Sequence, residues 1–473
     1  MKHSNFCKKF FSWFYRKDKI LMLIIFAGIG IRIFYLSYTD YNVRSHDADG
    51  HIDYIKYVAE KFEIPRGEQC WECHQMPLYY LFAGFFYKFF QMFGVTQLNF
   101  VLQCLSLAFF AVFLFFGVKT LKLIIKEKTY LRVATLILFF WPGGIINSIR
   151  ISNDSLFYAL WATGFYFLVN WIKEGKQKNF YIASIIVLLS LFAKTSGLIL
   201  VVLAGVALLL KVLLEINKKK KFFPKIFSSA ISHKKEIIMF FLITTLGLSA
   251  ISYKNFFHFE KIGEQAQNRS FFERTVKNDS LNSALKVGNN ISNYLRFDVE
   301  MFNKKVFTSP WVDGGGRQYF WNYLLKTSLF GEFDTDSYDK KGSPWPWATY
   351  INGLALVLFF TVIFGVVFLF FKNIFYLFKG NGSIVLPLFI LSSSLIPLVV
   401  LIFYRIRAPY ACNNDFRFIL PIMIPLPFIY VEWLKFWDGK WTPIKNLCIS
   451  LIILMAISSL MFFISISGLF QIL

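Results

Sequence analysis

Apolar runs, each close to the length of a membrane-crossing helix, recur from one end of this chain to the other. A spanning helix needs about 20 mostly apolar residues. Because lipid offers no hydrogen-bond partners, such a run must satisfy its own backbone polar groups, and a helix does so within one segment. The sequence therefore predicts an all-α polytopic membrane protein with about eleven transmembrane helices. The predicted spans are residues 20–38, 98–118, 133–149, 156–172, 180–193, 196–214, 237–253, 348–371, 384–404, 418–436 and 447–470.

Composition excludes the main classes of soluble protein. Charged residues make up 17% of the chain, against roughly 25% in soluble domains. The chain has 51 Lys and Arg against 28 Asp and Glu, a net charge of +23. These basic residues stand in short clusters between apolar runs, which indicates membrane topology rather than binding to nucleic acid. The 59 Phe exclude a disordered chain, and six Cys are too few for a disulfide-stapled small domain.

The charge of the loops predicts their side of the membrane. Basic residues precede the first run and also fill residues 119–132, so the positive-inside rule places both in the cytoplasm, with a cytoplasmic N-terminus. The loop at residues 39–75 is acidic and is predicted to be external. If residues 77–93 spanned the membrane, the cluster at 119–132 would move outside. We therefore predict that residues 77–93 form an interfacial helix on the outer membrane surface.

This topology predicts three parts in an integral, multi-pass protein, which we interpret as belonging to a bacterial cell membrane. The parts are an N-terminal transmembrane module (1–253) that carries the first external loop (39–97), an external loop region (254–346) and C-terminal transmembrane helices (347–473).

Ionisable residues near the ends of spans are the most informative ones in so apolar a chain. On the predicted outer face, arginine and lysine side chains occur together with carboxylates. Arginine matches phosphate geometry through two parallel hydrogen bonds, and a carboxylate can accept a proton. This combination suits a phosphorylated lipid and a hydroxyl acceptor. The outer polar segments are residues 45–51, 70–80, 150–154, 194–197 and 405–417.

Several short motifs follow one another in an order that resembles a known family. They are Asp47 with His51 and Tyr54, then QMPLYY at 75–80, ND at 153–154, KTSG at 194–197, LLKTSLFGEF at 324–333 and DFRFILP at 415–421. In this order they resemble the membrane glycosyltransferases of the C-type fold, in the branch of phospholipid carrier-dependent and protein-mannosyltransferase-like enzymes. The resemblance covers most of the chain.

The resemblance implies an inverting transfer of a sugar from a polyprenyl-phosphate donor to an acceptor hydroxyl on the external face. Donor, acceptor (protein, lipid or glycan) and membrane lipids would be the partners. In the family, the Asp of an Asp-Glu pair in the first external loop acts as base. Here the pair is Asp47-Ala48, so the second carboxylate is missing and Asp49 is its candidate replacement. No cofactor is identified, and a divalent metal is the one candidate.

We assign candidate roles from this resemblance and from side-chain chemistry. A carboxylate with a reference pKa of about 3.9 is ionised at neutral pH and can act as a general base. The catalytic candidates are Asp47, Asp49 and Asp154. The candidates for binding the donor phosphate are Arg417, Arg405, Arg407 and Lys194. The candidates for the substrate pocket are His51, His74, Gln75 and Tyr79.

Each assignment has an alternative that the sequence leaves open. Asp47 and Asp49 could be solvated loop carboxylates, and Asp154 could cap a helix. Lys194 could extend to the membrane interface, and the arginines could contact anionic lipid headgroups. At the level of the whole protein, the alternative to an enzyme is a non-catalytic carrier or transporter of a lipid-linked substrate.

The segment Cys70-Trp71-Glu72-Cys73-His74 matches the haem-attachment pattern C-x-x-C-H. A cytochrome-like electron carrier is therefore a third class, which we favour least because no redox partner motif accompanies this match. A disulfide or two free thiols would explain the same cysteines.

Overall fold

The computed structural model describes residues 18–43, 45, 47–67, 69–217, 231–259, 284–312, 316–332, 346–378, 384–439 and 441–467. Within these ranges the chain is helical, with one isolated antiparallel bridge between Lys286 and Tyr410 and no strand. The basic residues ahead of the first span, much of the predicted external region 254–346 and the last residues of the final predicted span lie outside the described residues.

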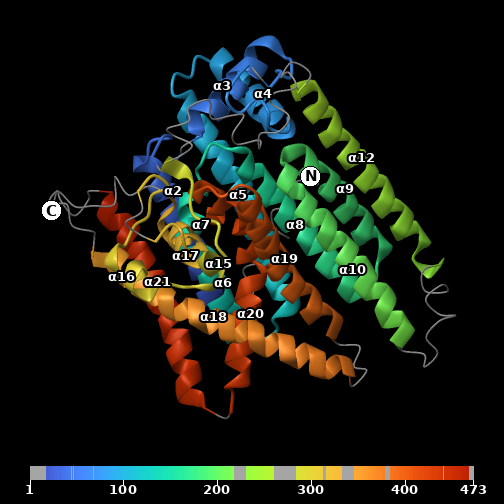
Figure 1. Cartoon of the computed structure of the whole chain (residues 1–473), viewed down its shortest axis with the longest axis vertical. Coiled ribbons are helices and arrows are strands. Elements are labelled where there is room, and N and C mark those ends of the chain that lie inside the picture. The colour runs from blue at the N-terminus through green and yellow to red at the C-terminus, as the bar shows by residue number, and fades with distance from the viewer. Residues whose placement is uncertain are drawn as a thin grey trace.

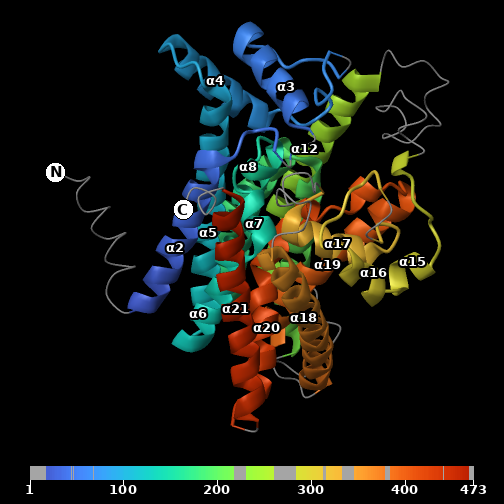
Figure 2. The ribbon, with the colours of Figure 1, turned by 90° about the vertical axis from the view of Figure 1, so that its left-hand side faces the viewer.

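Eight helices are long and apolar enough to cross a membrane. Many of their large apolar side chains, such as Leu23, Phe26 and Phe364, are exposed, as expected of surfaces that face lipid. The chain is therefore an integral, multi-pass, all-α membrane protein, as predicted (Figures 1 and 2). The eight lie in α2 (Lys19–Tyr38), α5 (Leu98–Ile124), α8 (Asn153–Glu174), η1 (Thr195–Gly197) with α10 (Leu198–Asn217), α12 (Lys234–Phe259), α18 (Pro346–Phe378), α19 (Val385–Arg407) and α21 (Thr442–Ile466).

The structure thus gives eight straight spans among the described residues, or nine if one bent pair is counted, where the sequence predicted about eleven. The run 133–149 divides into α6 (Lys128–Phe140) and α7 (Pro142–Ile146), because proline cannot continue the helix. The run 180–193 lies in α9 (Gln177–Ala193), which has 17 residues. The run 418–436 is bent by 66° between η6 (Phe416–Met423) and α20 (Pro425–Phe436).

The first loop carries two helices, α3 (Ala48–Lys61) and α4 (Leu78–Met92). Both lie at one end of the molecule, beyond the ends of the long helices (Figure 2). One face of α4 is buried, partly against α3, whereas Phe82, Phe85 and Phe89 on its other face are exposed. This pattern is typical of a helix that lies on a membrane surface, and the interfacial position of residues 77–93 stays a prediction that the pattern favours.

A short helical region between α12 and α18 packs beside the C-terminal helices (Figure 2). It contains α15 (Ser292–Leu295), α16 (Val299–Lys304) and α17 (Phe320–Phe330), and η5 (Ala411–Asn414) follows α19. The Lys326 ammonium group is fully buried and donates hydrogen bonds to Phe302 O (2.6 Å) and Asn352 Oδ1 (2.6 Å), which tie α17 to α16 and α18. The run 324–333 of the sequence, one of the motifs of the resemblance, therefore falls mainly on a buried helix, with Phe333 outside the described residues.

Candidate functional site

Four of the predicted site residues lie at or beside the ends of helices, and these helix ends meet at one end of the molecule. Asp47 immediately precedes α3, Asp154 lies in the first turn of α8, Lys194 follows the last residue of α9, and Arg417 lies in η6. Because α8 and α9 run side by side, the start of one helix meets the end of the other. Chain segments that are far apart in sequence thereby supply charges to the same place.

Arg417 is the centre of this arrangement. Its guanidinium group contacts Asp47 Oδ2 through Nη2 (2.9 Å) and Asp415 Oδ2 through Nε (3.2 Å). The Asp415 side chain also accepts a hydrogen bond from the backbone N–H of Arg417 (3.0 Å), which caps η6. Tyr158 on α8 donates to the carbonyl oxygen of Arg417 (2.7 Å). A buried guanidinium group is thus held on two sides by carboxylates and fixed through its own backbone.

A second buried ion pair lies next to the first. Lys194 donates to Asp154, and both residues are less than a tenth exposed. The Lys194 ammonium lies 5.2 Å and the Arg417 guanidinium 5.0 Å from the centroid of the Phe418 ring. Both cations therefore flank one aromatic ring, where each gains a favourable interaction with its π-face. The Lys194 ammonium group is thus engaged with Asp154 inside the protein.

The first loop adds polar groups that connect to one another. His51 Nδ1 lies 2.7 Å from the hydroxyl of Tyr80, and Gln75 donates to Glu72 Oε2 (3.0 Å). Asn153 in turn donates to Gln75 Oε1 (3.2 Å), so the loop is hydrogen-bonded to the start of α8. The loop and the helix that carries Asp154 are thereby fixed relative to each other.

Desolvation favours the uncharged form of both histidines of this loop, of which His51 is buried and His74 partly buried. Burial lowers the pKa of His51, partly offset by the carboxylates of Glu72 and Asp47. Burial lowers the pKa of His74 to about 4. His74 lies with its Nδ1 3.1 Å from the carbonyl oxygen of Trp71 and its Nε2 3.1 Å from the amide nitrogen of Gln75. Burial also raises the pKa of Glu72, against the opposing effect of His51.

Asp47, His51 and Glu72 form a group that could hold a metal ion. Their ligand atoms all lie within 4.8 Å of one another, and His51 and Glu72 are buried. Two carboxylates and one imidazole suit divalent ions such as Mn²⁺ or Zn²⁺. Among the described residues, this is the one group of three or more His, Cys, Asp or Glu side chains whose ligand atoms lie close enough to hold a metal ion. Glu72, not Asp49, is the second carboxylate beside Asp47.

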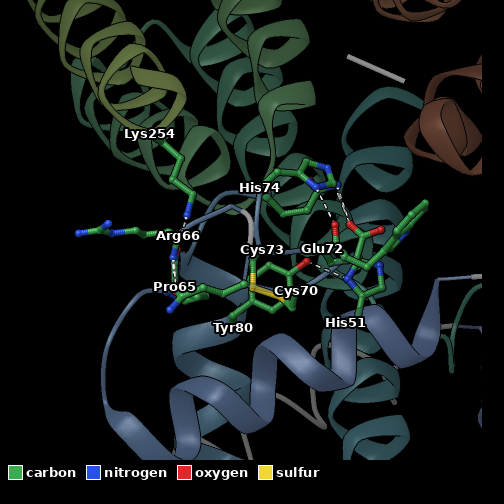
Figure 3. Close-up of a disulfide and its surroundings, with 12 residues drawn as sticks. His51, Pro65, Arg66, Cys70, Glu72, Cys73, His74, Tyr80 and Lys254 are labelled. Carbon is green, nitrogen blue, oxygen red and sulfur yellow. Dashed lines mark hydrogen bonds and ion pairs between the residues drawn. A yellow bond between two sulfur atoms is a disulfide. The ribbon is translucent and has the colours of Figure 1, made fainter. Parts of the chain in front are cut away.

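A disulfide closes the loop that presents Glu72. Cys70 and Cys73 are bonded to each other, with their Cα atoms 5.1 Å apart, and Glu72 lies between them (Figure 3). The loop packs directly on α3, because a Cβ atom added at Gly50 would lie 2.9 Å from Trp71 Cδ1 and 3.0 Å from Glu72 Cγ. Since the two sulfurs are used in the disulfide, they are not available for thioether bonds to haem. This removes the support for the electron-carrier class.

Asp49 lies apart from this centre. Its side chain is exposed and accepts a hydrogen bond from the Tyr41 hydroxyl (3.3 Å). Asp47 and Asp49 thus have different partners, Arg417 and Tyr41, although only one residue separates them in the chain. The role predicted for Asp49 remains a prediction without a contact to the centre in this structure.

Two arginines and one tyrosine among the predicted site residues also lie outside the charged centre around Arg417. Arg405 is buried and donates to the carbonyl oxygen of Gln318 (3.3 Å), and Arg407 is exposed at the end of α19. Tyr79 is fully buried, with its ring edge-on to Tyr80 at 5.2 Å between centroids. Arg405 and Arg407 take no part in the ion pairs of Arg417 and Lys194. Tyr79 packs among the apolar residues of the first loop.

Three carboxylates of this region were not among the site residues predicted from the sequence. Glu72 and Asp415 are described above. Glu332 is buried, accepts a hydrogen bond from the Tyr323 hydroxyl (2.8 Å) and lies near enough to interact electrostatically with Arg417. An acidic residue between two cysteines of an external loop was the available signal for Glu72. For Asp415 the signal was an acid two residues before Arg417, at the start of a helical turn.

Comparison with solved structures identifies a shared fold. The chain is similar to the crystal structure of the oligosaccharyltransferase of Archaeoglobus fulgidus in its apo form, with a TM-score of 0.51 and 11% identity. The match covers 97% of this chain and 57% of the other, so the chain spans little more than half the length of that protein. This likeness confirms the predicted C-type fold. No protein-family model matches the sequence, and no curated protein matches it either.

Proposed function

We propose that the chain is a membrane glycosyltransferase that transfers a sugar from a polyprenyl-phosphate donor to the hydroxyl group of an acceptor. The observation that carries the proposal is the position of Arg417, which contacts Asp47 and directly follows Phe416, a residue that lines an apolar cavity. A lipid-linked phosphate has an anionic group joined to a long apolar chain, and the two neighbouring environments match these two parts.

The cavity has a volume of about 240 Å³ and lies among α17, α18, α19, η6 and α20. Its lining is almost wholly apolar and includes Trp141, Leu358, Leu398 and Phe416. Phe416 precedes Arg417 in the chain, so the charged centre and the cavity meet at adjacent residues of η6. We infer that the hydrocarbon chain of the donor occupies this cavity and that its phosphate binds to the guanidinium group of Arg417.

In the proposed reaction, Asp47 accepts the proton of the acceptor hydroxyl while the hydroxyl oxygen attacks the anomeric carbon of the sugar. The bond from that carbon to the phosphate oxygen breaks, and the polyprenyl phosphate leaves. Arg417 and Lys194 stabilise the negative charge that develops on the leaving oxygen. Because the acceptor attacks the carbon directly, the reaction inverts its configuration.

A divalent cation fits beside this base. Asp47, His51 and Glu72 would hold it, and its charge would help to neutralise the phosphate of the donor. Neutral histidine is the form that can ligate a metal, and the lowered pKa of His51 favours this form.

The proposal places the centre on the outer face of a cell membrane. Arg132, Lys173 and Lys435 gather at the opposite end of the helices, close to Asp18, Leu123 and Glu127 respectively. The positive-inside rule assigns that end to the cytoplasm. A reporter fused after Lys128 is therefore expected in the cytoplasm.

The test is Asp47→Asn. We expect turnover with a polyprenyl-phosphate sugar donor to fall by roughly 10² to 10⁴, the usual contribution of a positioned general base, while donor binding and protein level are kept. Asp49→Asn is the matched control and should change turnover much less, because Asp49 is exposed and its side chain accepts a hydrogen bond from Tyr41. If Asp47→Asn retains full turnover, the chemistry lies elsewhere. If no turnover is found in the wild type but donor binding is, the chain is a carrier of a lipid-linked substrate.

A further inference from the structure

A polar groove lies beside α3 and shares no lining residue with the charged centre around Arg417. It has a volume of about 590 Å³ and lies among the end of α2, α3, α4 and the first turns of α5. It is unlike the hydrocarbon cavity, since hydroxyl and amide groups make up much of its lining. The residues used in the argument below are Thr39, Tyr41, Lys56, Tyr87, Asn99 and Gln103.

Polar groups in the wall of the groove are held in place by the fold. Gln103 is 3% exposed and donates to the carbonyl oxygen of Thr39 (3.2 Å), which fixes its amide at the groove. Thr39 is 7% exposed, and its hydroxyl is covered and has no hydrogen-bond partner among the described residues. Ligand hydroxyls can therefore bond to the less buried polar groups of the lining, such as those of Tyr41 and Asn99, and not to the Thr39 hydroxyl.

The side chains around the groove indicate the class of ligand. Tyr41 and Tyr87 combine an apolar ring with a polar hydroxyl, and Asn99 offers both donors and an acceptor. Of the charged side chains in the lining, Lys56 is the only cation and Asp40 the only anion. The groove therefore has no excess of positive charge to attract a phosphate headgroup. Aromatic faces beside neutral hydrogen-bonding groups suit an uncharged, polyhydroxylated molecule.

The groove is connected to the charged centre through α3. The Tyr41 hydroxyl donates to Asp49 (3.3 Å), and Asp49 is two residues beyond Asp47 at the start of that helix. A ligand of several sugar residues in the groove could therefore extend over the start of α3 to Asp47. We propose that the groove binds the saccharide part of the acceptor, so that the acceptor is a glycan. This inference rests on the proposed function.

The experiment measures saccharide binding without any transfer. Saturation-transfer NMR on the full chain in detergent would use maltotriose, chitotriose and mannotriose as neutral probes, with glycerol phosphate as a headgroup probe and a Ser/Thr-containing peptide as a polypeptide probe. We expect at least one trisaccharide to bind and neither of the other probes to do so. The proposal is wrong if no trisaccharide binds, or if the headgroup or the peptide binds in its place.

Variants locate the binding. Thr39→Val removes the hydroxyl and keeps the shape of the side chain. Because that hydroxyl is covered, this change should raise stability and leave saccharide affinity unchanged. Tyr41→Phe removes a hydroxyl at a less buried position of the lining and should lower saccharide affinity about fivefold to tenfold. Asn42→Ala, outside the groove, should leave affinity unchanged. Equal affinity in all variants would overturn the assignment.

The outcomes separate this inference from the proposed function. Asp47→Asn should bind the trisaccharide like the wild type. If a trisaccharide binds in the groove but the wild type transfers no sugar, the proposed function fails and the groove remains. If sugar is transferred but no trisaccharide binds, the groove proposal fails and the enzyme remains.

Discussion

The two ends of the helix bundle both carry ion pairs, yet these pairs differ in how deeply they are buried and in whether one cation contacts two carboxylates. At the basic end, Arg132 pairs with Asp18 at 2.9 Å and Lys445 with Asp438 at 2.8 Å, and in each pair one side chain is at least a fifth exposed. At the other end Arg417 is buried between two carboxylates. Exposed pairs contribute little to stability, and buried ones often cost more in desolvation than they return.

This difference indicates what each set of charges is for. The pairs at the basic end can be explained by topology and by modest links between helices. Stability does not explain the buried set, because well-packed apolar residues would stabilise the fold as well or better. Groups held in place before the substrate arrives are what stabilisation of a developing charge requires. We therefore connect the buried set with function, and the following changes test this.

The largest effect is expected at the pair of Lys194 and Asp154. Asp154→Asn leaves a buried ammonium group without its counter-charge, which should destabilise the protein by about 3–5 kcal/mol. The double variant Asp154→Leu with Lys194→Met should recover most of that stability and still lack sugar transfer. Thermal unfolding and turnover would be measured side by side. A double variant with wild-type turnover would show that the pair is structural.

The next effect concerns the geometry of Arg417. Arg417→Lys keeps the charge between Asp47 and Asp415 but loses the planar group that can bind phosphate through two hydrogen bonds. Turnover should fall on the order of 10²-fold, as for loss of one group that stabilises a developing anion. Arg407→Lys is the matched control, because Arg407 is exposed. If both variants keep wild-type rates and donor affinity, Lys194 becomes the better candidate for the phosphate site.

A smaller effect is expected from the disulfide. Replacing both Cys70 and Cys73 by Ser frees the loop that presents Glu72, at a cost of about 2 kcal/mol by the loop-entropy relation for so short a loop. Turnover should fall on the order of tenfold, because a displaced site residue loses its alignment. A dithiol reductant should lower wild-type turnover to the same level and leave the double variant unchanged. Cys104→Ser, at a free cysteine, serves as control. A reductant effect of equal size in both proteins would exclude the disulfide as its cause.

How much of this could be read from the sequence depends on the range of the interactions. Run length and loop charge are local, and they sufficed for the all-α membrane fold and for most spans. The helices break at Trp141-Pro142 and before Pro425, and both prolines stand in the sequence. Each lies in an apolar run long enough to cross the membrane, so run length alone predicted one unbroken span there. Asp47, Asp154, Lys194 and Arg417 could be assigned to one face, whereas their pairing depends on which helix ends meet. Glu72 was not predicted because its position depends on the disulfide between Cys70 and Cys73. The spacing of the two cysteines does not by itself show whether they are bonded.

The smallest effect is expected at the basic end, and it sets the scale for the others. Arg132→Gln removes the partner of Asp18, but Asp18 still accepts a hydrogen bond from the backbone N–H of Leu21 (3.1 Å) and still caps α2. Since the Arg132 side chain is 29% exposed, the loss should be about 1 kcal/mol or less, with turnover unchanged. Thermal unfolding in the same detergent as for Asp154→Asn makes the two values comparable. Equal destabilisation by the two changes would mean that burial does not distinguish the ends, and the functional argument drawn from burial would fail with it.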